Sequence, residues 1–394
     1  MTKSCIFDPE NLLNLIHKKA YETPFYLYDS HLLQAILKAA IKAKEAVFGA
    51  YGHIHYAMKA NHNKAILQMI QSYDLGVDCV SGGEIKCAID AGFAGNQVVF
   101  AGVGKTDLEI CDALKAGIFA FNCESLQEAE VIDQFAREMN VKAQICFRVN
   151  PDINVNTHHY ISTGSYDNKF GIAFEDVYQW LNTRYKHTSH IQFIGCHYHI
   201  GSQIIDMTSF SKLTESILAH YKQLTGNGFE IKHINVGGGL GINYSDPFAQ
   251  QIVDFKTYFN AFAPLSNLQG VNIHFELGRS LVGQIGVLIS KVLFTKKTAG
   301  SHFAILDAGM TELMRPALYQ AEHKIIALNP LAASKFEKYT LAGPICESSD
   351  IFAKNLLLPE IQRGNFIAIY SVGAYGKVLS SEYNLRPKVK EFLL

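Results

Sequence analysis

Short runs of β-branched and aromatic residues alternate with longer segments of helical periodicity over residues 50–280. The runs predict strands at residues 53–58, 76–80, 97–102, 119–123, 143–149, 191–199, 231–236 and 271–276. The longer segments predict helices, for example at 125–139, 174–185 and 207–224. Strands that alternate with helices form a parallel sheet, and eight such units in roughly 230 residues match a (β/α)8 barrel. An open doubly wound sheet is the alternative.

The pattern changes after about residue 284, where strands are predicted with little helix between them. They lie at residues 287–294, 302–306, 324–328, 338–341, 366–370 and 388–392. Such a run of strands is typical of a mostly antiparallel β domain. Residues 24–28 also predict a strand. We therefore expect a barrel domain at 30–283 and a C-terminal β domain at 284–394. Residues 1–29 are expected to pack with the C-terminal domain.

Composition narrows the partners that the chain is expected to have. Of its 394 residues, 18% are charged, and the net charge is −1. No block of charge predicts nucleic acid or a membrane surface as a partner, and no apolar run is long enough to span a membrane. None of the eight cysteines forms a C-x-x-C pair, so a zinc or redox site has no support. Dispersed thiols and an N-terminus without a signal-peptide pattern predict a cytoplasmic protein.

Chemically capable residues recur where the predicted barrel strands end. Active sites of barrels lie at this rim, so residues from six strands are expected to converge there. They are Lys59, Asp78, Ser81, Arg148, His199, Ser202, the glycines 237–239, Glu276 and Arg279. A lone lysine is most often a surface residue. Lys59, in an apolar context at the mouth of the first strand, is instead a candidate for a neutral amine that forms a Schiff base.

A glycine run at 237–241 follows the seventh predicted strand. Glycines let backbone N–H groups approach a phosphate closely, although a tight turn is the simpler interpretation. The run is not a dinucleotide-binding fingerprint, because Ile242 stands where the third glycine is required. The tripeptide 104–106 imitates the end of a Walker A loop, but Val99 replaces its first glycine, and we reject that reading.

Two His-x-His pairs lie in predicted strands, where residues i and i+2 point to one face. Such pairs can hold a metal ion, as in barrel hydrolases. No further cluster of ligands accompanies them, so packing with satisfied hydrogen bonds is expected for His53, His55 and His197. His199 differs, because it leads directly into Gly201 and Ser202 at a strand end. We therefore predict no metal site.

Other candidates have a simple structural interpretation as well as a functional one. Glu276 and Arg279 form either a salt bridge or a pair that serves a cofactor ring nitrogen and a substrate carboxylate. Cys346 is flanked by glycine, proline and acidic residues, and is either a proton donor or a small buried side chain. Tyr375 lies in a glycine-rich loop, where packing is the default.

Taken together and in this order, the motifs resemble the fold-type III decarboxylases that depend on pyridoxal 5'-phosphate (PLP). These proteins join an alanine-racemase-like barrel to a C-terminal β domain. The broad family motifs are Tyr-Ala-x-Lys-Ala-Asn at 56–61, His-x-Gly-Ser at 199–202, the glycines 237–239 and Gly-Ala-Tyr-Gly at 373–376. Motifs at 314–319, 346–348 and 383–387 resemble the diaminopimelate decarboxylase family in particular. Ornithine decarboxylases have aspartate where Glu347 stands here.

The resemblance implies a role for each site residue. Lys59 would bind PLP covalently, His199 would stack on its ring, and Glu276 would contact the ring nitrogen. The other implied cofactor contacts are Asp78, Arg148, Ser202, Gly238, Gly239, Gly278, Arg279 and Tyr375. Substrate would be bound by Arg279, Arg315, Tyr319, Glu347 and Tyr375, with Cys346 as proton donor.

The implied reaction is decarboxylation of meso-2,6-diaminopimelate to L-lysine, the last step of lysine biosynthesis. In relatives Cys346 and Glu347 come from the partner chain, so a homodimer with the active site at its interface is expected. Residues 158–171 resemble the family's active-site lid. Three alternatives are a related decarboxylase acting on ornithine, arginine or carboxynorspermidine, a non-catalytic PLP-binding protein, and a metal-dependent barrel hydrolase.

Overall fold

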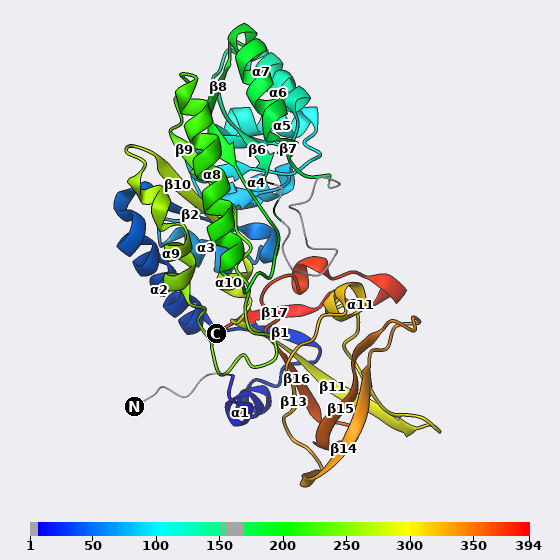
Figure 1. Ribbon diagram of the computed structural model, residues 1–394. Helices are drawn as coiled ribbons and strands as arrows, with labels where there is room; N and C mark the ends of the chain where they lie inside the picture. The colour runs from blue at the N-terminus through cyan, green and yellow to red at the C-terminus, as the bar shows by residue number, and fades with distance from the viewer. Residues whose placement is uncertain (1–6, 152, 154–168) are drawn as a thin grey trace. The chain divides into compact units, whose positions relative to one another are not determined.

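The computed structural model describes residues 7–151, 153 and 169–394. Contacts between Cα atoms divide the chain into two units (Figure 1). We call residues 36–241 and 253–281 the barrel unit, and residues 1–35, 242–252 and 282–394 the sheet unit. The predicted domains, 30–283 and 284–394 with residues 1–29 packed with the second of them, stay a prediction.

The barrel unit contains a closed parallel sheet, as predicted. Its strands follow the order β5-β4-β3-β2-β10-β9-β8-β6, and β5 also pairs with β6. The pairing of β5 with β6 closes the barrel, so the alternative of an open sheet is wrong. Each of the eight predicted strands overlaps an observed one. The bounds are β2 Gly52–Ala57, β3 Gly76–Cys79, β4 Val98–Phe100, β5 Ala120–Cys123, β6 Ala143–Asn150, β8 Ile191–His197, β9 His233–Asn235 and β10 Asn272–Leu277. The short β7, Ile172–Ala173, pairs with β6 and was not predicted.

Several of the helices that follow barrel strands begin with side-chain caps. Ser81, Thr106 and Ser125 each accept a hydrogen bond from the backbone N–H three residues later. Such N-caps satisfy free N–H groups and turn the chain from strand to helix at the rim. The helices are α1 Pro9–Lys19, α2 Ser30–Phe48, α3 Lys64–Gln71, α4 Gly82–Asp90, α5 Asp107–Ala116, α6 Leu126–Glu138, α7 Phe174–Thr183, α8 Thr208–Gly226, α9 Phe255–Ala261, α10 Arg279–Val282 and α11 Arg315–Tyr319.

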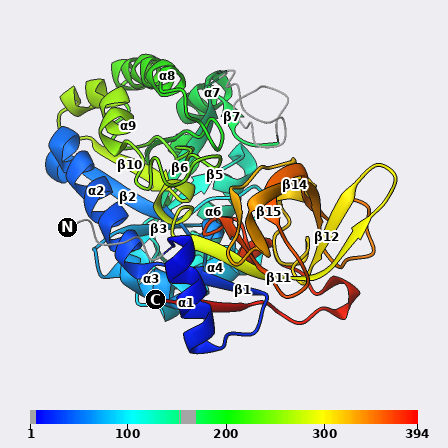
Figure 2. The same cartoon turned by 90° about the horizontal axis from the view of Figure 1, so that it is seen from below.

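The sheet unit is mostly antiparallel, as predicted. Its strands follow the order β13-β16-β11-β12-β14-β15, with β1 between β11 and β17. The pairs β12–β14 and β1–β17 are parallel. Strands β11, β12, β14 and β15 lie side by side in Figure 2. The bounds are β1 Phe25–Tyr28, β11 Gly286–Lys297, β12 His302–Leu306, β13 Ile325–Ala327, β14 Ala332–Ala342, β15 Ile351–Glu360, β16 Phe366–Tyr370 and β17 Lys390–Leu393. Only β15 among these was not predicted.

Apolar side chains tie the start of the described chain to the sheet. Leu12 and Ile16 of α1 pack in one cluster with Phe25, Val287 and Ile289. Burial of these side chains is the main force that holds α1 on strands β1 and β11. Within the described residues, no helix is long and apolar enough to cross a membrane.

Candidate active site

Lys59 lies in a short 3-10 turn, Met58–Ala60, directly after β2. Its Nζ atom is 2.8 Å from Oδ2 of Asp78, which is fully buried on β3. Burial and the nearby Glu276 charge raise the pKa of Asp78, and Lys59 opposes this shift. The apolar surroundings expected for Lys59 are therefore only part of its environment, because a carboxylate faces the amine.

Glu276 lies on β10 and is hydrogen-bonded to side chains from three other barrel strands. Its Oε1 atom accepts from Asn122 Nδ2 of β5 at 3.0 Å and from Asn235 Nδ2 of β9 at 2.7 Å. Its Oε2 atom is 3.1 Å from Nε2 of His197 on β8. Burial by itself would raise the pKa of Glu276, but its interactions with His197 and Lys59 outweigh burial and hold the pKa well below its usual value. The side chain is therefore a buried carboxylate.

The glycine run passes very close to neighbouring backbone. A Cβ atom on Gly238 would lie 1.9 Å from the carbonyl oxygen of Glu276, and Gly237 has a φ of +69°. Only glycine fits both requirements without a shift of the backbone. The N–H of Gly238 donates to Nδ1 of His199 at 3.2 Å. Nδ1 is thus an acceptor, which places the proton of a neutral His199 ring on Nε2.

His199 also belongs to the electrostatic cluster of this rim. Burial and the positive charges of Arg148 and Lys59 lower its pKa well below the usual value, so the ring is neutral. The neutral ring carries no charge that would compete with the cations around it. The mutual effects on pKa place five predicted residues in one cluster: Lys59, Asp78, Arg148, His199 and Glu276.

Two further predicted residues meet beside this cluster. Nη2 of Arg279, the first residue of α10, donates to Oγ of Ser202 at 2.9 Å. Gly278 precedes Arg279, and a Cβ atom there would lie 3.2 Å from Ala57. The chain therefore brings a guanidinium and a hydroxyl to the end of β8, a combination suited to an oxyanion or phosphate.

Arg148 has a partner that the sequence did not reveal. Its Nη1 atom is 2.6 Å from Oε1 of Glu124, and both side chains are buried. Oε2 of Glu124 accepts from the N–H of Gly171, and the ring of Phe170 lies 4.7 Å from the Arg148 guanidinium. This arrangement restrains the guanidinium beside His199. The role predicted for Arg148 in cofactor binding stays a prediction.

The remaining predicted site residues lie in the sheet unit. Arg315 is buried at the start of α11, where Nη1 is 2.7 Å from Nε2 of His323 and the guanidinium lies 4.3 Å from the Tyr244 ring. Tyr319 ends the same helix and is half-buried. Tyr375 is half-buried in its loop, with a φ of +55°.

Cys346 and Glu347 are exposed in the loop between β14 and β15. The N–H of Cys346 donates to Oδ1 of Asn384 at 3.1 Å, and the hydroxyl of Tyr383 donates to Oε1 of Glu347 at 2.7 Å. The motif at 383–387 therefore supports this loop. Of the predicted lid at 158–171, residues 158–168 lie outside the described residues.

Histidines fill the barrel below Glu276. Nε2 of His55 is 2.8 Å from Nδ1 of His274, and Nε2 of His274 is 2.9 Å from Nδ1 of His233. Nε2 of His53 is 2.8 Å from Oδ1 of Asn272. Packing with hydrogen bonds, as predicted for His53 and His55, is what the structure has. In the parts of the chain that the structure describes, no group of three or more His, Cys, Asp or Glu side chains is arranged to hold a metal ion.

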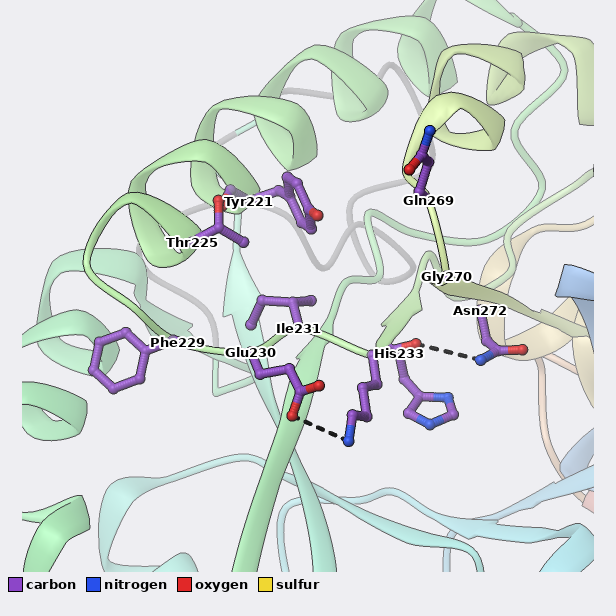
Figure 3. Close-up of a pocket in the computed structure, with 10 residues that line it drawn as sticks. Tyr221, Thr225, Phe229, Glu230, Ile231, His233, Gln269, Gly270 and Asn272 are labelled. Atoms are coloured by element: carbon purple, nitrogen blue, oxygen red, sulfur yellow. Dashed lines mark hydrogen bonds and ion pairs between the residues drawn. The ribbon is translucent and has the colours of Figure 1, made fainter.

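A cavity of about 390 Å³ lies at the opposite end of the barrel, where β9 and β10 begin (Figure 3). Lys232 and Glu230 form an ion pair there, with Nζ and Oε2 3.0 Å apart. The lining residues are Tyr221, Thr225, Phe229, Glu230, Ile231, Lys232, His233, Gln269, Gly270 and Asn272. None of them was predicted for the active site, and barrel sites lie at the C-terminal ends of strands. We therefore place the candidate site at the Lys59 rim.

The residues at this rim fit PLP. Glu276 is an ionised acceptor suited to a protonated ring nitrogen, and Lys59 supplies an amine. The closely packed glycine run and the Arg279–Ser202 pair are suited to a phosphate. The fold and these groups define the class as a PLP-dependent barrel enzyme. Residues 33–283 match the model of the family described as "Pyridoxal-dependent decarboxylase, pyridoxal binding domain".

Individual relatives narrow this class. The diaminopimelate decarboxylase of Bacteroides thetaiotaomicron is 47% identical over 375 residues, which cover 95% of this chain and 96% of the relative. The crystal structure of the Helicobacter pylori diaminopimelate decarboxylase complexed with L-lysine has a TM-score of 0.89 and 37% identity, covering 97% of this chain and 94% of that one. The M. jannaschii enzyme, also with L-lysine, has a TM-score of 0.89 and 34% identity, covering 97% and 89%. The chain belongs to the diaminopimelate decarboxylase family of PLP-dependent carboxy-lyases.

Proposed function

We propose that the protein decarboxylates meso-2,6-diaminopimelate to L-lysine and CO2, the last step of lysine biosynthesis. The observation that carries this proposal is the buried, ionised Glu276 at the same barrel rim as the Lys59–Asp78 pair. The family membership and the lysine found in complex with two relatives support the choice of substrate. The alternative of ornithine, arginine or carboxynorspermidine as substrate is not favoured by these relatives.

Bound PLP supplies an electron sink for the pair that remains when CO2 leaves. Lys59 is the residue that holds PLP through Nζ, and Asp78 orients this amine at 2.8 Å. Glu276 would keep a proton on the cofactor ring nitrogen by its negative charge. His199, neutral and fixed through Nδ1 by the N–H of Gly238, would lie against the cofactor ring.

The phosphate is held by residues around the end of β8 and the glycine run. Arg279 and Ser202 are already hydrogen-bonded to each other at 2.9 Å, so both are oriented before a ligand arrives. Gly239 and the backbone at Gly278 would provide N–H groups without side chains in the way, and Gly238, whose N–H donates to His199, would line the same site. Arg148 and Tyr375 complete the cofactor contacts.

Substrate selection comes from charged groups. Arg279, Arg315 and Tyr319 bind carboxylate and polar groups of diaminopimelate, and Glu347 binds its distal ammonium. A site built to pair a charged group discriminates strongly against an analogue without that group. Cys346 donates the proton that replaces CO2 on the substrate carbon, and its exposed position in the loop suits this role.

The proposed active unit is a homodimer in which Cys346 and Glu347 act in the partner's site. Exposed apolar side chains beside this loop support an interface: Tyr383 is 48% and Leu385 is 95% exposed. Mixing an inactive Lys59→Ala variant with an inactive Cys346→Ala variant should restore about a quarter of wild-type activity, since half of randomly mixed dimers then carry one intact site. No restored activity after subunit exchange would argue against the shared site.

We also propose a cytoplasmic location. Cys123, Cys146 and Cys196 are buried as free thiols. Free thiols of this kind are typical of a reducing compartment. Fractionation of cells that express the protein, with a periplasmic marker as control, tests this proposal.

The decisive test of the function is CO2 release by purified, PLP-loaded protein. Diaminopimelate, ornithine, arginine, lysine and carboxynorspermidine are compared at equal concentration. Release from diaminopimelate with lysine as product is expected, and Lys59→Ala should abolish it while exposed Lys86→Ala leaves it unchanged. Release mainly from another substrate would refute the assigned substrate and the roles of Arg315, Tyr319 and Glu347.

A further inference from the structure

The carboxylate of Glu276 has nearly all of its acceptor capacity occupied by protein donors. An ionised carboxylate offers about four lone-pair positions on its two oxygens. Asn122 and Asn235 occupy both positions on Oε1, at 3.0 and 2.7 Å, and His197 occupies one on Oε2, at 3.1 Å. One position on Oε2 remains.

One of these three donors is held in orientation by a further contact of its side chain, and the backbone of a second is anchored. Oδ1 of Asn235 accepts from the N–H of Gly237 at 2.9 Å, which turns its amide N–H toward Glu276. The backbone carbonyl oxygen of Asn122 accepts from Nζ of Lys105 at 3.0 Å, which anchors the β5 backbone that carries this side chain. The donors also come from three different barrel strands, so no local rearrangement of one loop removes them together. The carboxylate therefore has little freedom to rotate.

Other ionisable groups act on Glu276 through space. Lys59 lowers its pKa, whereas its own charge raises the pKa of Asp78. His55, its neighbour on β2, is also affected by this charge. Burial disfavours the charge, so the hydrogen bonds are needed to keep the carboxylate ionised. Loss of one of these hydrogen bonds is expected to favour the protonated form of Glu276.

We propose that Asn122, Asn235 and His197 are positioning residues that leave Glu276 a single acceptor site, on Oε2, for the cofactor ring nitrogen. This inference rests on the proposed function only through the cofactor. The three residues fix the direction from which the ring nitrogen donates, and they keep the negative charge that holds its proton. None of them contacts the substrate in this assignment.

The test uses a matched pair of variants at position 197. His197→Gln keeps an N–H donor at a similar reach, whereas His197→Leu removes it. The Leu variant should bind PLP about tenfold more weakly and shift the pH midpoint of the bound cofactor's absorbance by about 0.5 to 1 unit. Its kcat should fall about 10- to 100-fold, the range for loss of one hydrogen bond to a charged group, with KM nearly unchanged. The Gln variant should recover most of each effect.

Two comparisons separate positioning from general destabilisation. Asn182→Ala changes an exposed asparagine whose amide donates to the carbonyl oxygen of Tyr178 in its own helix, and it should alter none of these readouts. If His197→Leu does not fold, Asn122→Ala removes a different donor and is measured in the same way. An unchanged cofactor spectrum and PLP affinity, with kcat and thermal stability falling together, would overturn the proposal.

Failure of the proposed function gives a different result. A wild-type protein that binds PLP but acts on another amino acid leaves the cofactor readouts intact, and they still decide the role of the three donors. A wild-type protein that binds no PLP overturns both proposals together.

Discussion

Replacement of Lys105 by methionine is expected to destabilise the barrel unit strongly. Nζ of Lys105 is 2.6 Å from Oε1 of Glu128, 2.9 Å from the carbonyl oxygen of Gly102 and 3.0 Å from that of Asn122. The Lys105 side chain is 1% exposed and that of Glu128 is 10% exposed. Methionine keeps the length of the side chain but removes the charge and all three hydrogen bonds.

The magnitude follows from the charge that is left behind. Removal of one partner of a buried ion pair costs about 3–5 kcal/mol, because the other charge stays buried without compensation. Burial already raises the pKa of Glu128, and Lys105 opposes this shift. For a unit of this size, ~2–4 °C per kcal/mol gives a fall in Tm of about 10 °C.

The assay is thermal and urea denaturation of the apo protein, followed by circular dichroism. Lys86→Met is the matched control, because Lys86 pairs with Asp90 on the surface and should lose less than about 1 kcal/mol. The double variant Lys105→Met/Glu128→Met should regain most of the loss, since an apolar pair can replace a buried ion pair. A loss equal to that of Lys86→Met, or a double variant no better than the single one, would refute this reasoning.

Three further predictions concern other buried contacts. Gly238→Ala places a Cβ atom 1.9 Å from the carbonyl oxygen of Glu276. The free energy of unfolding should therefore fall by about 2–4 kcal/mol in denaturation experiments. Weaker PLP binding is expected when the cofactor is titrated into the variant. Burial lowers the pKa of His55 to about 4. The unfolded chain therefore binds more protons than the folded one between about pH 6.5 and pH 4. As the pH falls through this window, the free energy of unfolding should decrease by up to ~3 kcal/mol. In unfolding experiments at several pH values, His55→Gln should show a smaller decrease. Oδ1 of Asp133 accepts hydrogen bonds from the backbone N–H groups of residues 189–191. Asp133→Ala should lower the free energy of unfolding by about 2–4 kcal/mol, and a loss smaller than ~0.5 kcal/mol would contradict this assignment.

The sequence by itself determined the architecture to a large extent. Strand and helix periodicities are local signals that alternate along residues 50–280, so all eight barrel strands were predicted. Strand β15 was missed, because Lys354 and Asn355 interrupt its apolar pattern and Pro359 argues against a strand. It lies at the edge of its sheet, where such residues are tolerated.

Only the tertiary structure decided how the site residues are paired. Lys59, Asp78 and Glu276 could be assigned to the site from the sequence, because the C-terminal ends of barrel strands converge on one rim irrespective of which side chains pair there. The sequence did not reveal Asn122 or Asn235 as donors to Glu276. Asn122, Asn235 and Glu276 come from strands far apart in the sequence. The hydrogen bonds from the two amides to Glu276 depend on barrel closure and strand register, which no local pattern encodes.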